Sequence, residues 1–228
     1  MAIKNLIVIL GAGGCARELY WNIHDFYKSH NLSDTQIVFV DDISERLELV
    51  TGRKVVPIVK NWDFSAYQKR IKNAGFYCGI ASPNGKKQMV ARALAAGLAP
   101  LPTLVHPRAV VQGIDSTLGF GGYIAPGCVL TVNIQLGDYV LLNYNCTVGH
   151  DAKIGNFSTC NPGCHVSGNV NLGDGVMLGA GTFVLENLKI PAGTVAGAQS
   201  CIIHSIEGEG TTVVGVPAKC IKKPRANN

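Results

Sequence analysis

The sequence predicts an α/β N-terminal domain with a small Rossmann-like parallel sheet over residues 1–102, followed by a left-handed parallel β-helix over residues 103–228. Before residue 103, strand-like apolar segments alternate with helical patterns. After Leu118, a six-residue period continues without a change of register. A proline-rich stretch, AGLAPLPTLVHP, separates the two patterns. A chain of 228 residues is long enough for one large domain or for two small domains that each have a hydrophobic core.

The N-terminal part reads as strands alternating with helices. The segment NLIVIL is predicted to be a buried strand that leads into the glycine turn GAGG. Its apolar run is too short for a signal peptide, and no run in the chain approaches the 18 residues of a membrane span. Apolar residues then recur at helical spacing from Leu19 to Tyr27. QIVFVDD and FYCGIA are further predicted strands, and NGKKQMVARALAAGL is a predicted helix, which together are typical of a parallel α/β sheet.

The glycine turn has the spacing of a phosphate-binding loop. Gly11, Gly13 and Ala16 fit the pattern G-x-G-x-x-G/A between a strand and a helix, where backbone amides and the helix N-terminus favour an anionic group. Asp41 and Asp42 end the next strand, in position to accept hydrogen bonds from a ribose or a base. About 100 residues are too few for both halves of a dinucleotide site, which favours one nucleotide-bearing ligand over NAD. A tight turn without a ligand is the alternative.

The second part carries a hexapeptide repeat, which is a β-helix signature. Every sixth residue from Leu118 to Ile202 is aliphatic or small, and a second apolar or small series follows four residues after each of them. Three short strands complete a coil of 18 residues, and each coil buries its apolar side on the next. The segment VHPRAVVQGIDSTLG is predicted to be a first, slightly irregular coil.

A His-Asp pair interrupts this repeat. His150 comes two places after the inward position Val148, so it is predicted on an outer face or corner, where core packing does not require a histidine. Histidine is suited to general base catalysis near neutral pH, and Asp151 can orient the ring or favour its protonated form. Adding 18 places Gly168 directly above His150, where it leaves space beside the base and offers a backbone amide to a developing oxyanion. A solvated surface histidine is the plainer interpretation.

Other features argue against competing functions. Adding 18 to Pro162 gives Ala180 and then Ala198, a column of small residues that predicts a groove for a long ligand. There is no basic stripe interleaved with aromatics, so nucleic-acid binding is not expected, although a net charge of +5 suits an anionic small molecule. Eight cysteines without a secretion signal predict reduced thiols in the cytoplasm. Three convergent histidines for zinc are absent from the middle coils, so no metal is expected.

The chain resembles the hexapeptide-repeat sugar acetyltransferases of the sialic acid O-acetyltransferase and bacillosamine-pathway N-acetyltransferase type. The resemblance covers nearly the whole chain, through GAGG and VDD at the front, LLNYNCTVGHDAKIGNF and NPGCHVSGNVNLGDGVMLGAGTFV in the repeat, and VVGVPAK near the end. It implies a left-handed β-helix behind a small α/β domain, acetyl-CoA as co-substrate, and a homotrimer with acetyl-CoA bound between neighbouring β-helices.

The resemblance also implies roles for individual residues. His150 matches the catalytic base, Asp151 its acidic neighbour, and Asn143 a supporting asparagine. The positions that match acetyl-CoA contacts are Thr159, Gly168, Ala180 and Ala198. The positions that match the nucleotide-sugar site are Gly13, Gly14, Cys15, Asp41, Asp42 and, in the loop IASPNGKK, Ala81. Cys15 and Thr159 stand where the family often has histidine, and the hydroxyl of Thr159 can still donate one hydrogen bond to acetyl-CoA. Cys15 and the segment ASPNG, where the family more often has a glycine and an asparagine or aspartate, leave the identity of the sugar open.

The function that the resemblance implies is acetyl-CoA-dependent N-acetylation of a nucleotide-linked 4-amino sugar for bacterial surface glycans, with UDP as the preferred nucleotide. His150 removes the amine proton, and no covalent enzyme intermediate is needed. Orientation of two bound substrates supplies much of the acceleration. O-acetylation of sialic acid or a related sugar is one alternative, and a noncatalytic trimeric β-helix scaffold is another.

Overall fold

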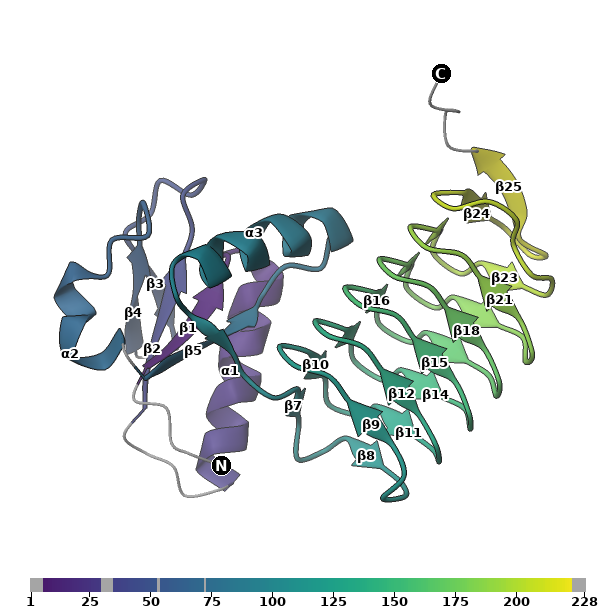
Figure 1. Ribbon diagram of the computed structural model, residues 1–228, viewed down its shortest axis with the longest axis horizontal. Coiled ribbons are helices and arrows are strands. Elements are labelled where there is room, and N and C mark those ends of the chain that lie inside the picture. Colours follow the sequence, from purple (N-terminus) through teal and green to yellow (C-terminus); the bar gives the residue numbers. More distant parts are fainter. Residues whose placement is uncertain (1–5, 30–34, 53, 72, 223–228) are drawn as a thin grey trace.

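The computed structural model describes residues 6–29, 35–52, 54–71 and 73–222, and it confirms the predicted fold class (Figure 1). An α/β domain is followed by stacked coils of short parallel strands. Asn5 of the predicted first strand and residues 223–228 of the basic tail lie outside the described residues. Within the described ranges, no helix combines the length and the apolar character needed to cross a membrane.

The front domain is built on one sheet with the strand order β3-β4-β2-β1-β5-β6. Its parallel strands are β1 (Leu6–Leu10), β2 (Gln36–Val40), β4 (Lys54–Val59), β5 (Ala74–Cys78) and β6 (Ala99–Pro100). The edge strand β3 (Glu48–Thr51) pairs antiparallel with β4, a hairpin that the sequence analysis did not identify. The helices are α1 (Gly14–Ser29), α2 (Gln68–Ile71) and α3 (Pro83–Ala95), with a 3₁₀ turn, η1, at Ser65–Tyr67.

The two long helices cover opposite faces of this sheet. Alternate residues of a strand point to opposite faces, and all five residues of β1 are buried. Ile7 and Ile9 share a cluster with Leu19 of α1, whereas Leu6 and Val8 share another with Val90 of α3. The continuous apolar run LIVIL therefore reflects a central strand that is covered on both sides.

The second domain is a β-helix with three flat faces. Face 1 contains β7 (Leu104–Val105), β10 (Tyr123–Ile124), β13 (Leu141–Leu142), β16 (Thr159–Cys160), β19 (Met177–Leu178), β22 (Val195–Ala196) and β24 (Thr212–Val214). Face 2 contains β8 (Val110–Val111), β11 (Val129–Leu130), β14 (Thr147–Val148), β17 (His165–Val166), β20 (Phe183–Val184) and β23 (Cys201–Ile202). Face 3 contains β9 (Thr117–Leu118), β12 (Gln135–Leu136), β15 (Lys153–Ile154), β18 (Asn171–Leu172) and β21 (Lys189–Ile190). A last strand, β25 (Lys219–Lys222), pairs antiparallel with β24.

The 18-residue coil is confirmed by the strand register. Thr147 pairs with His165 and Val148 with Val166, and the same offset relates successive strands of every face between β10 and β23. The predicted inward series is buried from Ile124 to Ile202, and Leu118 in the irregular first coil is partly buried. Packing of each coil on the next is therefore what stabilises this domain.

The corners of the β-helix follow a backbone rule. Every sixth residue from Gly121 to Gln199 has a positive φ, between 54° and 76°. Glycine, asparagine and aspartate adopt this left-handed conformation at the lowest cost, and most of these corner residues are of these types. Asp151, with φ 61°, is one of them.

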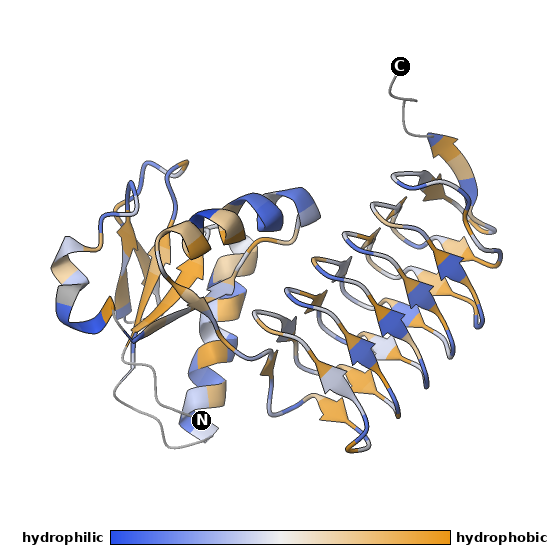
Figure 2. Ribbon diagram, in the orientation of Figure 1, coloured by the Kyte–Doolittle hydropathy of each residue, from blue (hydrophilic) through white to orange (hydrophobic). Residues whose placement is uncertain are grey.

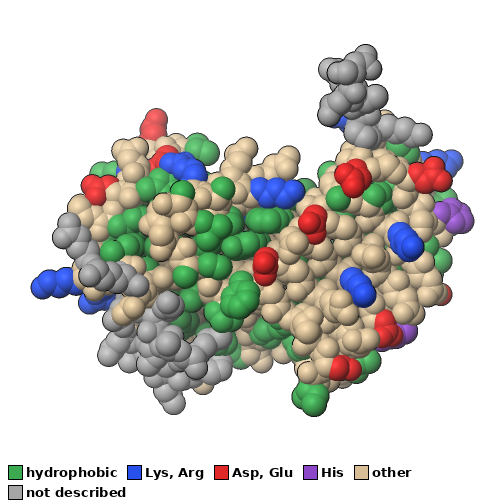
Figure 3. Space-filling view, viewed as in Figure 1, with side chains coloured by type: hydrophobic (Ala, Val, Ile, Leu, Met, Phe, Trp, Pro, Cys, Tyr) green, Lys and Arg blue, Asp and Glu red, His purple; other side chains and the backbone are tan. Residues whose placement is uncertain are grey.

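The three faces differ in their surroundings. Face 3 presents polar side chains, and its strands carry the hydrophilic residues seen in Figure 2 and the scattered charges on the same view in Figure 3. On face 1, Tyr123, Leu141 and Thr159 are buried although they point outward from the β-helix. The front domain covers them, and the predicted boundary after residue 102 falls between β6 of the front sheet and β7 of face 1.

Candidate active site

The His-Asp pair lies at the corner between faces 2 and 3, directly after β14. His150 Nδ1 is 2.8 Å from Asp151 Oδ2, and the two side chains are 59% and 43% exposed. A carboxylate can only accept a hydrogen bond, so the neutral imidazole donates from Nδ1 and its Nε2 is the basic nitrogen. Within the described part of the chain, no group is hydrogen-bonded to Nε2. The geometry is that of a histidine held ready to accept a proton from outside the protein.

The pKa of the Asp151 carboxyl is lowered by its partners. The hydrogen bond with His150 has the largest effect, and a hydrogen bond from Asn133 follows. Asp151 therefore stays ionised at neutral pH and favours the positive charge that His150 acquires when it takes a proton.

Gly168 lies against the imidazole, as the 18-residue spacing predicted. A Cβ atom at this position would be 2.6 Å from Nε2 and 2.7 Å from Cε1 of His150. The imidazole ring thus packs directly against the backbone of Gly168. Any residue with a Cβ atom at this position would clash with the ring and displace it. Within the described residues, the Gly168 amide has no hydrogen-bond acceptor, which leaves it available beside the base.

Replacement of Gly168 by alanine is expected to lower kcat by about 100-fold, because the new methyl group displaces the imidazole by roughly 1 Å. Initial rates of the reaction in which His150 acts as the base measure the effect, and the thermal unfolding midpoint checks that the fold is retained. In a His150→Ala background the same substitution should change nothing further, because the ring that it displaces is gone. Additive losses in the two backgrounds would contradict this explanation.

Three predicted residues lie at a different corner from His150. Asn143 follows β13, and Ala180 and Ala198 occupy the same corner between faces 1 and 2 in later coils. The Asn143 side chain accepts a hydrogen bond from the Tyr144 amide, and both alanines are exposed. Within one chain, face 2 separates this column of small residues from the His-Asp pair, so the structure does not bring the two groups together.

The glycine turn opens the carboxyl edge of the front sheet. Gly13 and Gly14 are exposed, and a Cβ on either would meet no atom within 4 Å. They begin α1 beside the loop that follows β5, where the strand order changes direction, and ligands of open α/β sheets bind at such points. Burial and then Glu18 raise the pKa of the Cys15 thiol to about 11, so Cys15 is a neutral group at this edge.

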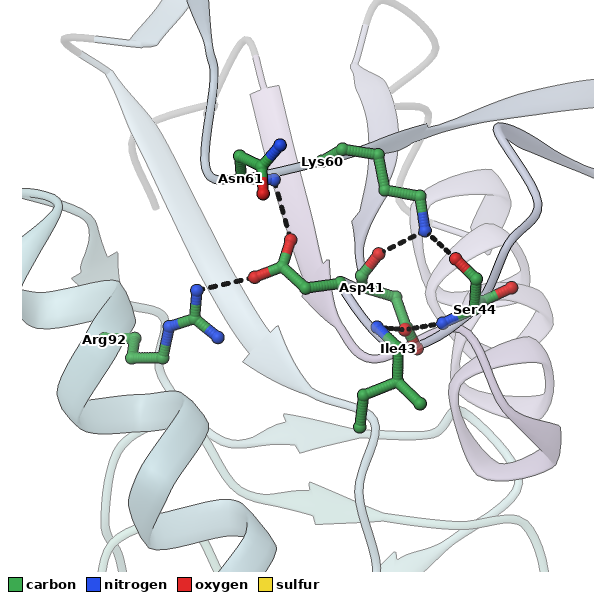
Figure 4. Close-up of polar contacts among 7 residues, drawn as sticks. Asp41, Ile43, Ser44, Lys60, Asn61 and Arg92 are labelled. Atoms are coloured by element: carbon green, nitrogen blue, oxygen red, sulfur yellow. Dashed lines mark hydrogen bonds and ion pairs between the residues drawn. The ribbon is translucent and has the colours of Figure 1, made fainter.

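Asp41 organises the loops around the turn (Figure 4). Its Oδ2 accepts a hydrogen bond from the Ala12 amide at 2.8 Å, and its Oδ1 accepts from the amides of Ile43 and Ser44. Lys60 donates to the carbonyl oxygens of Asp41 and Ser44. The carboxylate therefore fixes the glycine turn against the end of β2, a role that the sequence analysis did not foresee.

Asp42 has different partners, Arg92 and Asn61, which are labelled in Figure 4. Its Oδ2 is 2.5 Å from Arg92 Nη2, and its Oδ1 accepts from the Asn61 amide at 2.7 Å. Burial acts to raise the pKa of Asp42, but the Asn61 and Arg92 contacts outweigh it and lower the pKa. Arg92 also lies 5.0 Å from the centre of the Trp62 ring. The charge of Asp42 at the edge of the sheet is thus balanced by Arg92, and the carboxylate is not an isolated hydrogen-bond acceptor.

Thr159 is buried at the contact between the two domains. It was expected to contact acetyl-CoA, but its side chain has no exposed surface and its hydroxyl donates a 2.7 Å hydrogen bond to the carbonyl of Ala81. Face 1 is covered at this point by the front domain, so Thr159 is a contact between the two domains. Ala81, expected near the nucleotide sugar, is its partner in the loop that leads to α3.

Two residues that sequence reasoning missed complete these arrangements. Asn133 donates to Asp151 from the preceding coil, and subtraction of 18 from 151 identifies it. Lys86 joins the front domain to the β-helix, and no sequence pattern distinguishes it from a solvated helical lysine. Among the described residues, no group of three or more His, Cys, Asp or Glu side chains is placed to hold a metal ion.

Known proteins share this architecture. No protein-family model matches the sequence. GDP-perosamine N-acetyltransferase from Escherichia coli O157:H7 is 29% identical over 152 residues, which cover 65% of this chain and 63% of that protein. The matched region thus spans less than two thirds of this curated relative.

Solved structures match over almost the whole chain. The acetyltransferase domain of PglB from Neisseria gonorrhoeae FA1090 has a TM-score of 0.82 and 26% identity, covering 95% of this chain and 100% of that domain, and it has also been solved in complex with acetyl coenzyme A. WeeI from Acinetobacter baumannii AYE has a TM-score of 0.82 and 26% identity, covering 95% of this chain and 99% of its own. Together with the hexapeptide coils and the two-domain order, these similarities support the resemblance of the chain to the hexapeptide-repeat sugar N-acetyltransferases.

Proposed function

We propose that this protein transfers the acetyl group of acetyl-CoA to the amino group of a nucleotide-linked amino sugar, with a UDP-linked 4-amino sugar as the first candidate. The observation that carries the proposal is the exposed His150–Asp151 pair seated on Gly168. The open glycine turn at the edge of the front sheet supports an anionic, nucleotide-bearing acceptor. The perosamine N-acetyltransferase and the acetyl-CoA complex of the PglB domain support the donor and the class of acceptor.

His150 acts as the general base in this proposal. The sugar amine attacks the thioester carbonyl, so that a C–N bond forms and the C–S bond of acetyl-CoA breaks. His150 accepts the amine proton at Nε2 and returns it to the departing thiolate, while Asp151 stabilises the protonated ring. The Gly168 amide stabilises the negative charge that develops on the carbonyl oxygen. The transferred group never becomes attached to the protein.

The arrangement of corners supports a homotrimer with sites between subunits. His150 lies between faces 2 and 3, whereas Asn143, Ala180 and Ala198 lie between faces 1 and 2, so one chain cannot present both groups to one bound acetyl-CoA. Large apolar side chains also stand exposed in the column of His150, with Val132 45% exposed one coil below it and Ile114 below that. A second β-helix packed against this corner covers them and brings its small-residue column to His150.

We also propose that this reaction takes place in the cytoplasm. All eight cysteines are free thiols, which suits a reducing compartment.

Thiol release from acetyl-CoA tests the function directly. The purified protein is assayed with a UDP-linked 4-amino sugar, with GDP-perosamine and with free sialic acid, and the product is identified by its mass. Amide formation on one nucleotide-linked amino sugar supports the proposal and decides between uridine and guanosine carriers. Turnover with sialic acid alone would replace it by O-acetylation, and no turnover with any acceptor would favour the noncatalytic scaffold.

A further inference from the structure

The corner between faces 2 and 3 carries a column of short polar residues. Asp115, Asn133, Asp151, Asn169 and Asn187 follow one another at intervals of one coil. The last four have positive φ angles between 54° and 62°, which explains why the column consists of asparagine and aspartate. Backbone conformation alone therefore accounts for the residue types, but not for the contacts between their side chains.

One pair in this column is joined through its side chains. Asn133 Nδ2 donates to Asp151 Oδ1 at 2.6 Å, and the other oxygen of the same carboxylate, Oδ2, lies 2.8 Å from His150 Nδ1. The backbone N–H of Asn133 in turn donates to Asp115 Oδ1 at 3.2 Å. Each oxygen of Asp151 thus has one partner, so the carboxylate cannot rotate without losing a hydrogen bond.

The hydrogen bond from Asn133 to Asp151 affects how His150 is held. An exposed aspartate without a second partner rotates freely, and its hydrogen bond to a neighbouring histidine is then intermittent. We propose that Asn133 is a positioning residue for the acetyl transfer proposed above: it holds the Asp151 carboxylate toward His150 Nδ1 and thereby keeps Nε2 as the unprotonated nitrogen. Asn133 touches neither substrate in this arrangement and acts only through Asp151.

The surroundings identify a matched control. Asn187 shares the corner and the left-handed backbone, with φ 62°, and lies two coils beyond Asp151. Within the described ranges, its side chain makes no hydrogen bond. Asn187→Gly therefore changes the backbone preference as Asn133→Gly does, without touching the carboxylate. Within the described ranges, the other charged or titratable groups of this corner are Asp115, Glu186 and His204, and all three stay in place in the two variants.

The kinetic test compares Asn133→Gly, Asn133→Asp and Asn187→Gly. Loss of one hydrogen bond to a charged group predicts a fall in kcat of about tenfold for Asn133→Gly, with KM for both substrates unchanged. Asn133→Asp places a second carboxylate beside Asp151, which favours the protonated imidazole, so the acid limb of the pH–rate profile should also move to higher pH. Asn187→Gly should retain the wild-type rate and profile. Equal kcat values for wild type and both Asn133 variants would overturn the inference.

A second readout is independent of turnover. Nitrogen-15 NMR of histidine distinguishes an imidazole protonated at Nδ1 from one protonated at Nε2, and His150→Ala assigns the signal among the six histidines. The wild type should show His150 protonated at Nδ1, and Asn133→Gly should show a mixture of the two forms. A missing acceptor substrate leaves this result intact, so failure of the proposed function and failure of the inference are distinguishable. An unchanged tautomer in Asn133→Gly would refute the positioning role whatever the reaction is.

Discussion

His150→Ala is expected to lower kcat by about 1,000-fold while KM for both substrates changes little, because removal of a general base affects the reaction and not the binding of its substrates. The Nε2 atom of His150 is the one basic nitrogen at this corner that is exposed, oriented by a carboxylate and seated beside a free amide. Initial rates of thiol release at saturating acetyl-CoA measure the loss. His150→Gln, which keeps a polar group of similar size, should be as slow as the alanine variant.

His204→Ala is the matched control for this experiment. His204 is also exposed and lies in the same column of the β-helix, three coils beyond His150, but no described group pairs with it. Its removal should leave the rate unchanged. If His150→Ala retained more than about one tenth of the wild-type rate, substrate orientation alone would explain the catalysis and the role of the base would be wrong.

The sequence predicted much of the β-helix because its period is strict. Once the coil is known to contain 18 residues, Gly168 must lie against His150, and the structure places it there. Subtraction of 18 from Asp151 identifies Asn133 in the same way. Ala180 is six residues short of two full coils from His150, so the two residues lie at different corners, with one face of the β-helix between them. These placements follow from register alone, because in a β-helix sequence distance and spatial distance are related by a fixed rule.

The contacts between the domains could not be predicted in this way. Thr159 and Ala81 are 78 residues apart, and neither lies in a pattern that marks it as an interface residue. The aromatic residue Tyr139 occupies a left-handed corner where glycine or asparagine is expected, and its ring stacks on Phe76 of the front sheet and on Phe157 of the next coil. Tertiary packing has here overridden local preference, and only the structure reveals the partner.

Lys86→Met is expected to lower the free energy of unfolding by about 2–3 kcal/mol at pH 7, because it removes the donor to two buried carbonyls. Lys86 projects from α3 and is 1% exposed. Its Nζ donates to the carbonyl oxygens of Tyr139 and Ser158, each at 2.9 Å, and so ties the front domain to a corner of the β-helix. Methionine keeps the length of the stem but satisfies neither oxygen. Chemical denaturation at one fixed protein concentration measures the difference.

The difference in the free energy of unfolding between wild type and Lys86→Met should also depend on pH, because the Lys86 amine is buried. Desolvation lowers the pKa of Lys86 from 10.5 to about 8, with the cysteines around it opposing the shift. Between pH 8 and 10.5 the unfolded chain keeps the Lys86 proton while the folded protein loses it, so the stability of the wild type rises with pH in this window. Loss of the proton still leaves a neutral amine that donates to both carbonyls. The gap between wild type and Lys86→Met should therefore widen from pH 8 upward.

The neighbouring lysine separates this effect from a general change of charge. Lys87 is exposed, with its Nζ 5.8 Å from the centre of the Phe157 ring, and Lys87→Met removes the same charge one residue away. The Lys87→Met substitution should lower the free energy of unfolding by less than about 1 kcal/mol, and this difference should not grow between pH 8 and 10.5. A gap that narrowed with pH for Lys86→Met would mean that the protonated amine is the more stable form in the folded protein. In that case the two carbonyl oxygens would raise the pKa of Lys86 by more than burial lowers it. The contact between the domains would then be strongest when the Lys86 amine is protonated.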